Sequence, residues 1–242
     1  MRGNKTSFGT VDYRRFGWWI GIVVILPLCL TPAVSGSDHD FEVWTWEKFW
    51  VDLSGLGLPE HTNLYLENAN RFDQDVSRQF QFHQRIGIRF DIPWLEGWSI
   101  MPVWQHVDYE PGSNEDRYHF DLAYSRKKIF DSNWSLKFRF RMDLRDLYDK
   151  DQISERFRPK ISFSHPLPIE IEGRPIKVYF SNEVNYDTTV DQFNRHRFGT
   201  GFNLPITPKM TWGIGYQIET NRLKNNSWDS DSMLMTGLTF RF

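Results

Sequence analysis

The chain has 242 residues with 29 basic and 31 acidic side chains, 17% aromatic residues and a mean hydropathy of −0.55. This length suits one domain of ordinary size, and the near-neutral charge argues against a general nucleic-acid-binding protein. No apolar run after the N-terminal region approaches the ~20 residues of a membrane-spanning helix. Many aromatic residues within a polar average are typical of a transmembrane β-barrel, whose strands alternate lipid-facing and lumen-facing side chains. A soluble β-sandwich or lipocalin-like barrel is the alternative.

Residues 1–35 have the pattern of a cleaved secretory signal peptide. Four basic side chains precede the apolar run 18–30, and small residues follow it. The run is too short for a retained membrane anchor, and cleavage after Ser35 or after Gly36 fits equally well. The only cysteine, Cys29, lies in this segment, so the mature chain contains no disulfide. Mature charge is 25 basic against 30 acidic side chains, a net of −5.

Residues 36–242 are predicted to form one outer-membrane β-barrel. They divide into eleven short segments of alternating apolar and polar residues separated by turn signals, which is the pattern of repeated hairpins. The predicted strands are 41–53, 63–71, 79–90, 98–109, 117–125, 134–145, 156–164, 176–186, 195–204, 210–219 and 232–242. Bacterial barrels normally have an even number of strands. We therefore predict an all-β, antiparallel up-and-down barrel of 10 or 12 strands.

The last segment, 232–242, alternates Leu238, Phe240 and Phe242 with polar residues and glycine. A terminal strand with an open edge promotes aggregation, so this strand is predicted to pair with the first one. A C-terminal strand that ends on an aromatic residue also resembles the signal by which the barrel-assembly machinery recognises its clients, through strand addition. Phe240 and Phe242 are the residues predicted to carry this signal.

Five blocks of sequence, taken in order, indicate a family. They are Asp-Phe-Glu-Val-Trp at 40–44, Gln-Phe-His-Gln-Arg-Ile-Gly at 81–87, Phe-Arg-Pro-Lys at 157–160, Phe-Asn-Arg-His-Arg-Phe-Gly-Thr-Gly at 193–201, and the terminal segment 237–242. In this order they resemble the bacterial outer-membrane β-barrel family catalogued as domain of unknown function 2490. The resemblance implies a barrel in the outer membrane of a Gram-negative bacterium. It brings no activity and no catalytic residues.

The polar faces of the predicted strands are rich in basic residues. The basic side chains predicted to line the lumen are Arg85, Arg89, Arg117, Arg139, Arg141, Arg158, Lys160, Arg195 and Arg197. Inward acids are predicted at Glu67, Asp121, Asp143, Glu183 and Glu219. If the basic groups pair with these acids, they fill a narrow, plugged structural barrel. If basic charge is in surplus, the lumen is a narrow passive channel that prefers small anionic solutes.

The aromatic residues are predicted to form girdles at the membrane surfaces, where amphipathic rings settle at the headgroup level. These residues are Trp44, Trp46, Trp98, Trp104, Trp134, Trp212 and Tyr216. Sugar-stacking platforms would instead need tryptophans that point into the lumen. Only the segment 98–109, whose facing is ambiguous, could readily supply them.

An outer-membrane hydrolase of lipids or acyl esters is the alternative function. Ser164 and His165 are adjacent, so their side chains point to opposite faces of a strand. His83 and His119 share the lumen without a marked nucleophile. The acidic loops lack the ligand spacing of an EF-hand, and no metal or cofactor is predicted. The predicted partners are outer-membrane lipids, lipopolysaccharide, the barrel-assembly machinery and small anionic solutes, but not nucleic acid.

Overall fold

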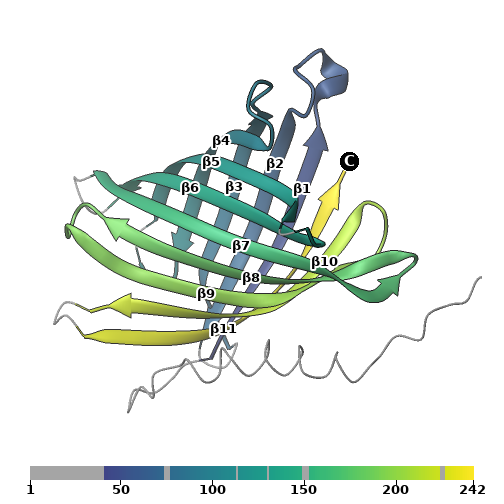
Figure 1. The fold of residues 1–242 in the computed structure, drawn as a ribbon. Helices are drawn as coiled ribbons and strands as arrows, with labels where there is room; N and C mark the ends of the chain where they lie inside the picture. The colour runs from purple at the N-terminus through teal and green to yellow at the C-terminus, as the bar shows by residue number, and fades with distance from the viewer. Residues whose placement is uncertain (1–40, 74–76, 113, 130, 149–152, 224–226) are drawn as a thin grey trace, which may run out of the picture. The chain divides into compact units, whose positions relative to one another are not determined.

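A computed structural model describes residues 41–73, 77–112, 114–129, 131–148, 153–223 and 227–242. Eleven strands form a closed barrel in which each strand pairs with its neighbours in sequence (Figure 1). The strands are β1 (Phe41–Asp52), β2 (Asn63–Asp73), β3 (Arg78–Asp91), β4 (Trp98–Tyr109), β5 (Glu115–Ile129), β6 (Trp134–Leu147), β7 (Ile153–Ile171), β8 (Arg174–Asp187), β9 (Gln192–Pro205), β10 (Met210–Arg222) and β11 (Trp228–Arg241). The predicted signal peptide, residues 1–35, lies outside the described residues.

The only helix that the described residues form is the single 3₁₀ turn η1 (Ser54–Leu56). No helix among them is long and apolar enough to cross a membrane.

The barrel closes through a parallel pair of strands. β1 lies alongside β11 in register from Phe41 opposite Ser232 to Trp50 opposite Arg241, whereas all other neighbouring strands pair in antiparallel fashion. The prediction that the last strand closes against the first is confirmed, but the prediction of a purely antiparallel barrel is wrong. The reason is the strand count, because an odd number of alternating strands leaves the first and last strands running in the same direction. The count of eleven equals the number of alternating segments and lies between the ten and twelve strands that the even-number rule favoured.

The strand connections lie at two opposite rims of the barrel. The connections 53–62, 92–97, 172–173 and 206–209 lie at one rim, the turn end, where β1 and β11 also finish. The connections 110–114 and 188–191 lie at the opposite rim, the loop end, where β1 begins. The chain therefore enters the barrel at the loop end and leaves it at the turn end (Figure 1).

The β7–β8 hairpin is longer than the sequence predicts. The prolines around Pro166 indicated a turn over 166–175, but β7 continues to Ile171 and the chain reverses at Glu172 and Gly173. Both of these residues have positive φ, 49° and 72°, as a two-residue hairpin turn with the right twist requires. A register shift between Pro166 and Glu170 accommodates the residues that lack a backbone donor.

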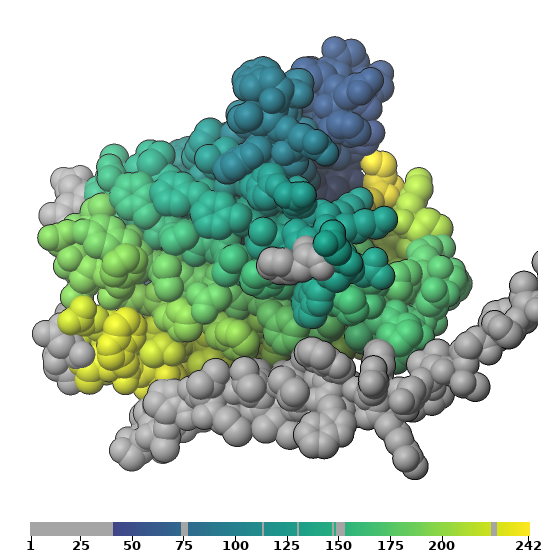
Figure 2. Space-filling model, in the orientation of Figure 1, coloured from purple at the N-terminus to yellow at the C-terminus, as the bar shows by residue number. Residues whose placement is uncertain are grey.

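Alternation along the strands separates an interior of polar side chains from an apolar exterior. In β2, for example, Tyr65, Glu67 and Ala69 are buried in the interior, while Leu64 and Leu66 face outward. The outward side chains of neighbouring strands form a continuous wall on the face shown in Figure 2. The core of this protein is therefore the lumen itself.

Glycines allow two aromatic rings to lie flat against the inner wall. A side chain at Gly237 or Gly213 would collide with the indole of Trp46, and one at Gly215 would collide with the hydroxyl of Tyr179. Because the wall is bare at these positions on β10 and β11, the two rings lie close to the backbone. Because the two rings lie close to the backbone at these glycines, they extend less far into the middle of the barrel.

Candidate functional site: a basic chamber in the lumen

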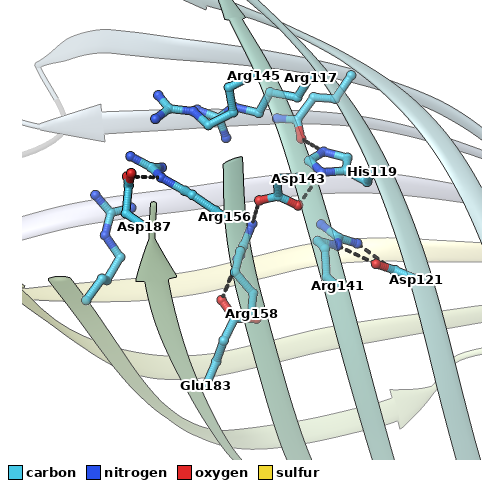
Figure 3. Close-up of polar contacts among 12 residues, drawn as sticks. Arg117, His119, Asp121, Arg141, Asp143, Arg145, Arg156, Arg158, Glu183 and Asp187 are labelled. Carbon is cyan, nitrogen blue, oxygen red and sulfur yellow. Dashed lines mark hydrogen bonds and ion pairs between the residues drawn. The ribbon is translucent and has the colours of Figure 1, made fainter. Parts of the chain in front are cut away.

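Buried ion pairs fill the lumen near the loop end. Glu115 has no exposed surface and accepts hydrogen bonds from Arg117, at 2.8 Å, and from Arg145. Arg156 donates to Asp187 at 2.6 Å, across β7 and β8 (Figure 3). Each of these carboxylates lies at the end of its strand that faces the loops. Because a buried charge is tolerated only when it is paired and hydrogen-bonded, these contacts make the loop end a packed layer of paired charges.

A second set of polar contacts crosses the middle of the lumen. His119 lies 2.6 Å from Asp143, which accepts a hydrogen bond from Arg158 at 3.0 Å (Figure 3). Glu183 on β8 lies at the centre of this set, with Arg139, Arg158 and Arg197 at 2.5, 2.6 and 3.1 Å. One carboxylate therefore binds guanidinium groups from three strands, β6, β7 and β9. Its removal would leave Arg139 without a carboxylate partner among the described residues, whereas Arg158 and Arg197 would keep Asp143 and Glu219.

Eight of the nine predicted lumen residues are paired with a carboxylate. Arg85 pairs with Glu67, Arg89 with Asp91, Arg117 with Glu115, Arg141 with Asp121, and Arg195 with Glu219, while Arg139, Arg158 and Arg197 share Glu183. The ninth, Lys160, has no ion pair or hydrogen bond to any described residue. The arginines consequently act as a paired scaffold rather than as a surplus of free charge.

A cavity of about 450 Å³ remains in the lumen on the turn side of this scaffold. Its lining includes Asn203, two residues before β9 ends, and Thr239, two residues before β11 ends. The loop-end pairs of Glu115 and Asp187 do not contribute to the lining that the described residues form. The lumen is thus divided into a layer of ion pairs at the loop end and a hollow space toward the turn end, which we call the basic chamber.

Cationic side chains dominate the lining of the basic chamber. The charged residues that line it are Lys48, Arg85, Lys137, Arg139, Arg141, Arg158, Lys160 and Arg197, together with Glu67 and Glu183. Three further carboxylates, Asp121, Asp143 and Glu219, pair with the lining arginines from the side. Eight cations against these five carboxylates leave a formal excess of three positive charges.

The three lysines account for this excess. Lys137 and Lys160 make no ion pair with any residue that the structure describes, and Lys48 lies 3.9 Å from its nearest carboxylate, on Glu67. The three come from β6, β7 and β1, and Lys48 is near enough to interact electrostatically with both of the others. The Nζ atom of Lys48 also lies 4.7 Å from the centroid of the Trp46 ring. This cation–π contact holds the Lys48 ammonium group on the chamber side.

The inward tryptophans come from β1 rather than from β4. Trp44 and Trp46 line the chamber, so the prediction that they belong to the outer girdle is wrong. In β4 the buried residues alternate with Trp98 and Trp104, which face outward. The indole of Trp44 packs 5.5 Å from the guanidinium of Arg71, so cations cover the β1 rings. The rings of Trp44 and Trp46 therefore position cationic side chains, and they are not free to stack against a sugar.

Sequence reasoning missed Lys48 and misplaced Glu115. The polar residues Glu42 and Lys48 have the same parity in β1 as Trp44 and Trp46, a signal that this whole face points inward. Glu115 lies outside the predicted strand 117–125, but β5 begins two residues earlier, at Glu115 itself. Both errors concern strand ends or a strand that carries large aromatic residues on its inner face.

Comparison with known proteins gives a family. The family model described as "Protein of unknown function (DUF2490)" matches residues 41–230. The chain belongs to the DUF2490 family. This confirms the family predicted from the ordered blocks, and the match runs from the start of β1 into β11. No curated protein and no solved structure gave a match.

The contacts of this DUF2490 barrel do not assemble a hydrolase site among the described residues. Ser164 shares the inward face of β7 with Ser162, whereas the ring of His165 packs 4.9 Å from that of Trp134 on the outside. The adjacent pair is therefore split, as its spacing predicts. His119 bonds Gln105 and Asp143 through its two ring nitrogens, and no hydroxyl or thiol in the described part bonds to it.

His83 is occupied in the same way as His119, by Gln81 and Gln105. No group of three or more potential metal ligands occurs among the described residues. Part of the acidic loop 146–151 lies outside them.

Proposed function

We propose that this DUF2490 protein is an outer-membrane β-barrel with a narrow, passive lumen that prefers small anions. The exterior supports a membrane location. Large apolar side chains such as Ile86, Phe120 and Phe202 are 40–45% exposed on its outward face. Soluble monomers rarely expose apolar patches as extensive as a belt around the whole molecule. A lipid environment removes this cost, as in other transmembrane barrels.

The distribution of outward charge supports the same location. Within the described strands, charged side chains on the outer face lie within three residues of a strand end, with the exception of Glu47. Charge on the lipid-facing side is costly at mid-membrane and nearly neutral at the interfaces. Glu47 lies in a shallow groove beside Asn68 and Thr236 at the β1–β11 seam, where polar neighbours soften that cost.

Export and assembly follow from the two ends of the sequence in this proposal. Residues 1–35 direct secretion, and the terminal strand with Phe240 and Phe242 is recognised by the barrel-assembly machinery. The rings of these two phenylalanines stack 6.5 Å apart, next to the seam between β1 and β11. Outer-membrane lipids and lipopolysaccharide are the surrounding partners.

The observation that carries the proposed function is the contrast between the lining arginines, each paired with a carboxylate, and Lys137 and Lys160, which have no ion-pair partner among the described residues. A fixed positive excess in a narrow space with low-dielectric walls attracts anions and repels cations. The ion pairs of Glu115 and Asp187 place side chains across the loop end of the lumen. We therefore expect a small conductance with anion preference, rather than the open conduction of barrels with 16–18 strands.

Planar-bilayer recording under a potassium chloride gradient tests this function. The expected result is a small current whose reversal potential has the sign of anion preference, weakened in a Lys137→Gln/Lys160→Gln variant. Lys209→Gln is the matched control, because Lys209 is exposed in the turn 206–209 and does not line the chamber. Cation preference, or equal selectivity in the double variant, would contradict the proposal. The absence of any current would contradict passage through the lumen and favour the alternative, a plugged structural barrel.

The proposal includes no catalytic role. It would be overturned by turnover of a lipid or acyl-ester substrate that disappears in His119→Ala and persists in His165→Ala. The second variant is the control because His165 lies on the outer face, away from the lumen network.

A further inference from the structure

We infer that the basic chamber is a binding site for a small molecule that carries phosphate groups, held by Lys48, Lys137 and Lys160. The inference rests on the proposed anion preference of the lumen and names the class of anion. It requires a ligand with several negative charges rather than a single one. Three features of the chamber support this. They are the number of lysine ammonium groups, the chemical difference between lysine and arginine, and the volume of the cavity with its uncharged polar lining.

The number of lysine ammonium groups in the chamber favours a ligand with several negative charges. Three ammonium groups from β1, β6 and β7 line one cavity, and among the described residues the only carboxylate within ion-pair distance of any of them is that of Glu67, 3.9 Å from Lys48. A monovalent anion such as chloride or acetate would compensate only one of the three charges. A ligand with two or three negative charges within a few ångströms would compensate them together, and it gains from each cation in a low-dielectric space.

The chemistry of the cations favours phosphate. The guanidinium groups of the lining, which would grip carboxylates through paired hydrogen bonds, are already bonded to Glu67, Asp121 and Glu183. The free groups are lysine ammoniums, compact point charges with three rotatable donors each, and lysine binds phosphate in this way. A phosphate group offers several acceptor oxygens around one centre, so donors that approach from three strands can meet it without a planar fit.

The space and the neutral lining fit a small molecule. A volume of about 450 Å³ is within the range of small-molecule sites and corresponds to roughly fifteen water molecules at ~30 Å³ each. Ser162, Ser181 and Asn203 line the same cavity and make no side-chain hydrogen bond with another described residue. These free donors complement the non-phosphate part of a ligand such as a phosphorylated sugar.

The ion pairs of Glu115 and Asp187 occupy the loop side of the lumen, so the inference places ligand entry at the turn end. Lys137 lies near the turn end, three residues after the start of β6, and its side chain is exposed. Lys48 is presented across the barrel by its contact with the ring of Trp46. The three lysines thus face a ligand from opposite walls.

Isothermal titration of the purified full-length mature barrel in detergent micelles, with pyrophosphate as the probe, tests the inference. The expected result is saturable binding of one pyrophosphate per barrel, with acetate at equal ionic strength giving no saturable heat. Lys137→Gln and Lys160→Gln should each weaken binding at least about tenfold, the scale of one charge-assisted contact. Lys160→Arg should retain most of the affinity, and the matched control Lys209→Gln should leave it unchanged.

Three outcomes would overturn the inference: no saturable binding of pyrophosphate to the folded barrel, equal binding of acetate, or undiminished affinity in the Lys137→Gln variant. Lys137 is the safest position to change because it makes no ion pair with the described residues and its side chain is exposed to the lumen. Bilayer recording separates this inference from the proposed function. Anion-preferring current without pyrophosphate binding refutes only the site, whereas binding without current refutes only the passage.

Discussion

Replacing Glu183 by glutamine tests whether the lumen scaffold depends on its shared carboxylates. Glu183 is 3% exposed and binds Arg139, Arg158 and Arg197 within 3.1 Å. The glutamine retains the shape of the side chain but removes the negative charge, so the formal excess in the chamber rises from three to four. Removal of one partner from a buried ion pair costs about 3–5 kcal/mol, and here Arg139 would stay buried without a carboxylate partner among the described residues.

The assay is urea unfolding of the barrel refolded into lipid vesicles, followed by tryptophan fluorescence. With a slope of about 2 kcal/mol per molar urea, a loss of 3–5 kcal/mol lowers the midpoint by about 1.5–2.5 M. Glu170→Gln is the matched control, because Glu170 is exposed near the end of β7 and makes no ion pair with the described residues. It should change the free energy of unfolding by less than about 0.5 kcal/mol. Equal midpoints for the two variants would refute the scaffold.

Three further predictions concern the wall and its closure. Gly237→Ala should lower stability by about 1–3 kcal/mol in the same assay, because the added carbon meets Trp46, whereas Gly55→Ala, with nothing within 4 Å, should have little effect. Epitopes inserted before Phe41 and after Phe242 should be accessible from opposite sides of the outer membrane in intact cells, because β1 and β11 are parallel; accessibility from one side would contradict the odd strand count. Deletion of Phe242, whose backbone makes two hydrogen bonds to β1, should reduce outer-membrane levels and leave export intact, and unchanged levels would count against the assembly signal.

The alternation of residues made most of the wall predictable. All eleven strands coincide with segments of period two, because inward and outward side chains meet opposite environments along the whole strand. The eleven alternating segments by themselves imply a parallel closure, but the even strand number of bacterial barrels led to the prediction of ten or twelve strands and of a purely antiparallel barrel. The β7–β8 hairpin was missed because Pro166 and Pro168 indicate a turn, whereas the register shift there lets the ladder continue.

The candidate site shows a sharper limit of sequence reasoning. Arg139 and Lys160 look equivalent in sequence, as basic residues on the polar face of neighbouring strands. In the structure Arg139 shares Glu183, while Lys160 has no partner among the described residues. Which cation is neutralised depends on the stagger between neighbouring strands and on how far each side chain extends across the lumen. The alternation of residues in the sequence predicts neither. Pairing in three dimensions, rather than the number of basic residues, therefore defines the chamber.

The most direct test of the account is to compare two single-cysteine variants at neighbouring positions of β7. Each is labelled with a water-soluble, membrane-impermeant maleimide. The mature chain is predicted to lack cysteine, so Ile161→Cys and Ser162→Cys each introduce a single thiol. Ile161 is 39% exposed on the outer face, and Ser162 lines the basic chamber. In lipid vesicles we predict that Cys at position 162 reacts and Cys at position 161 is protected, with both reacting after denaturation. Rapid labelling at position 161 in the folded, vesicle-bound protein would contradict a membrane-embedded barrel with an aqueous basic chamber.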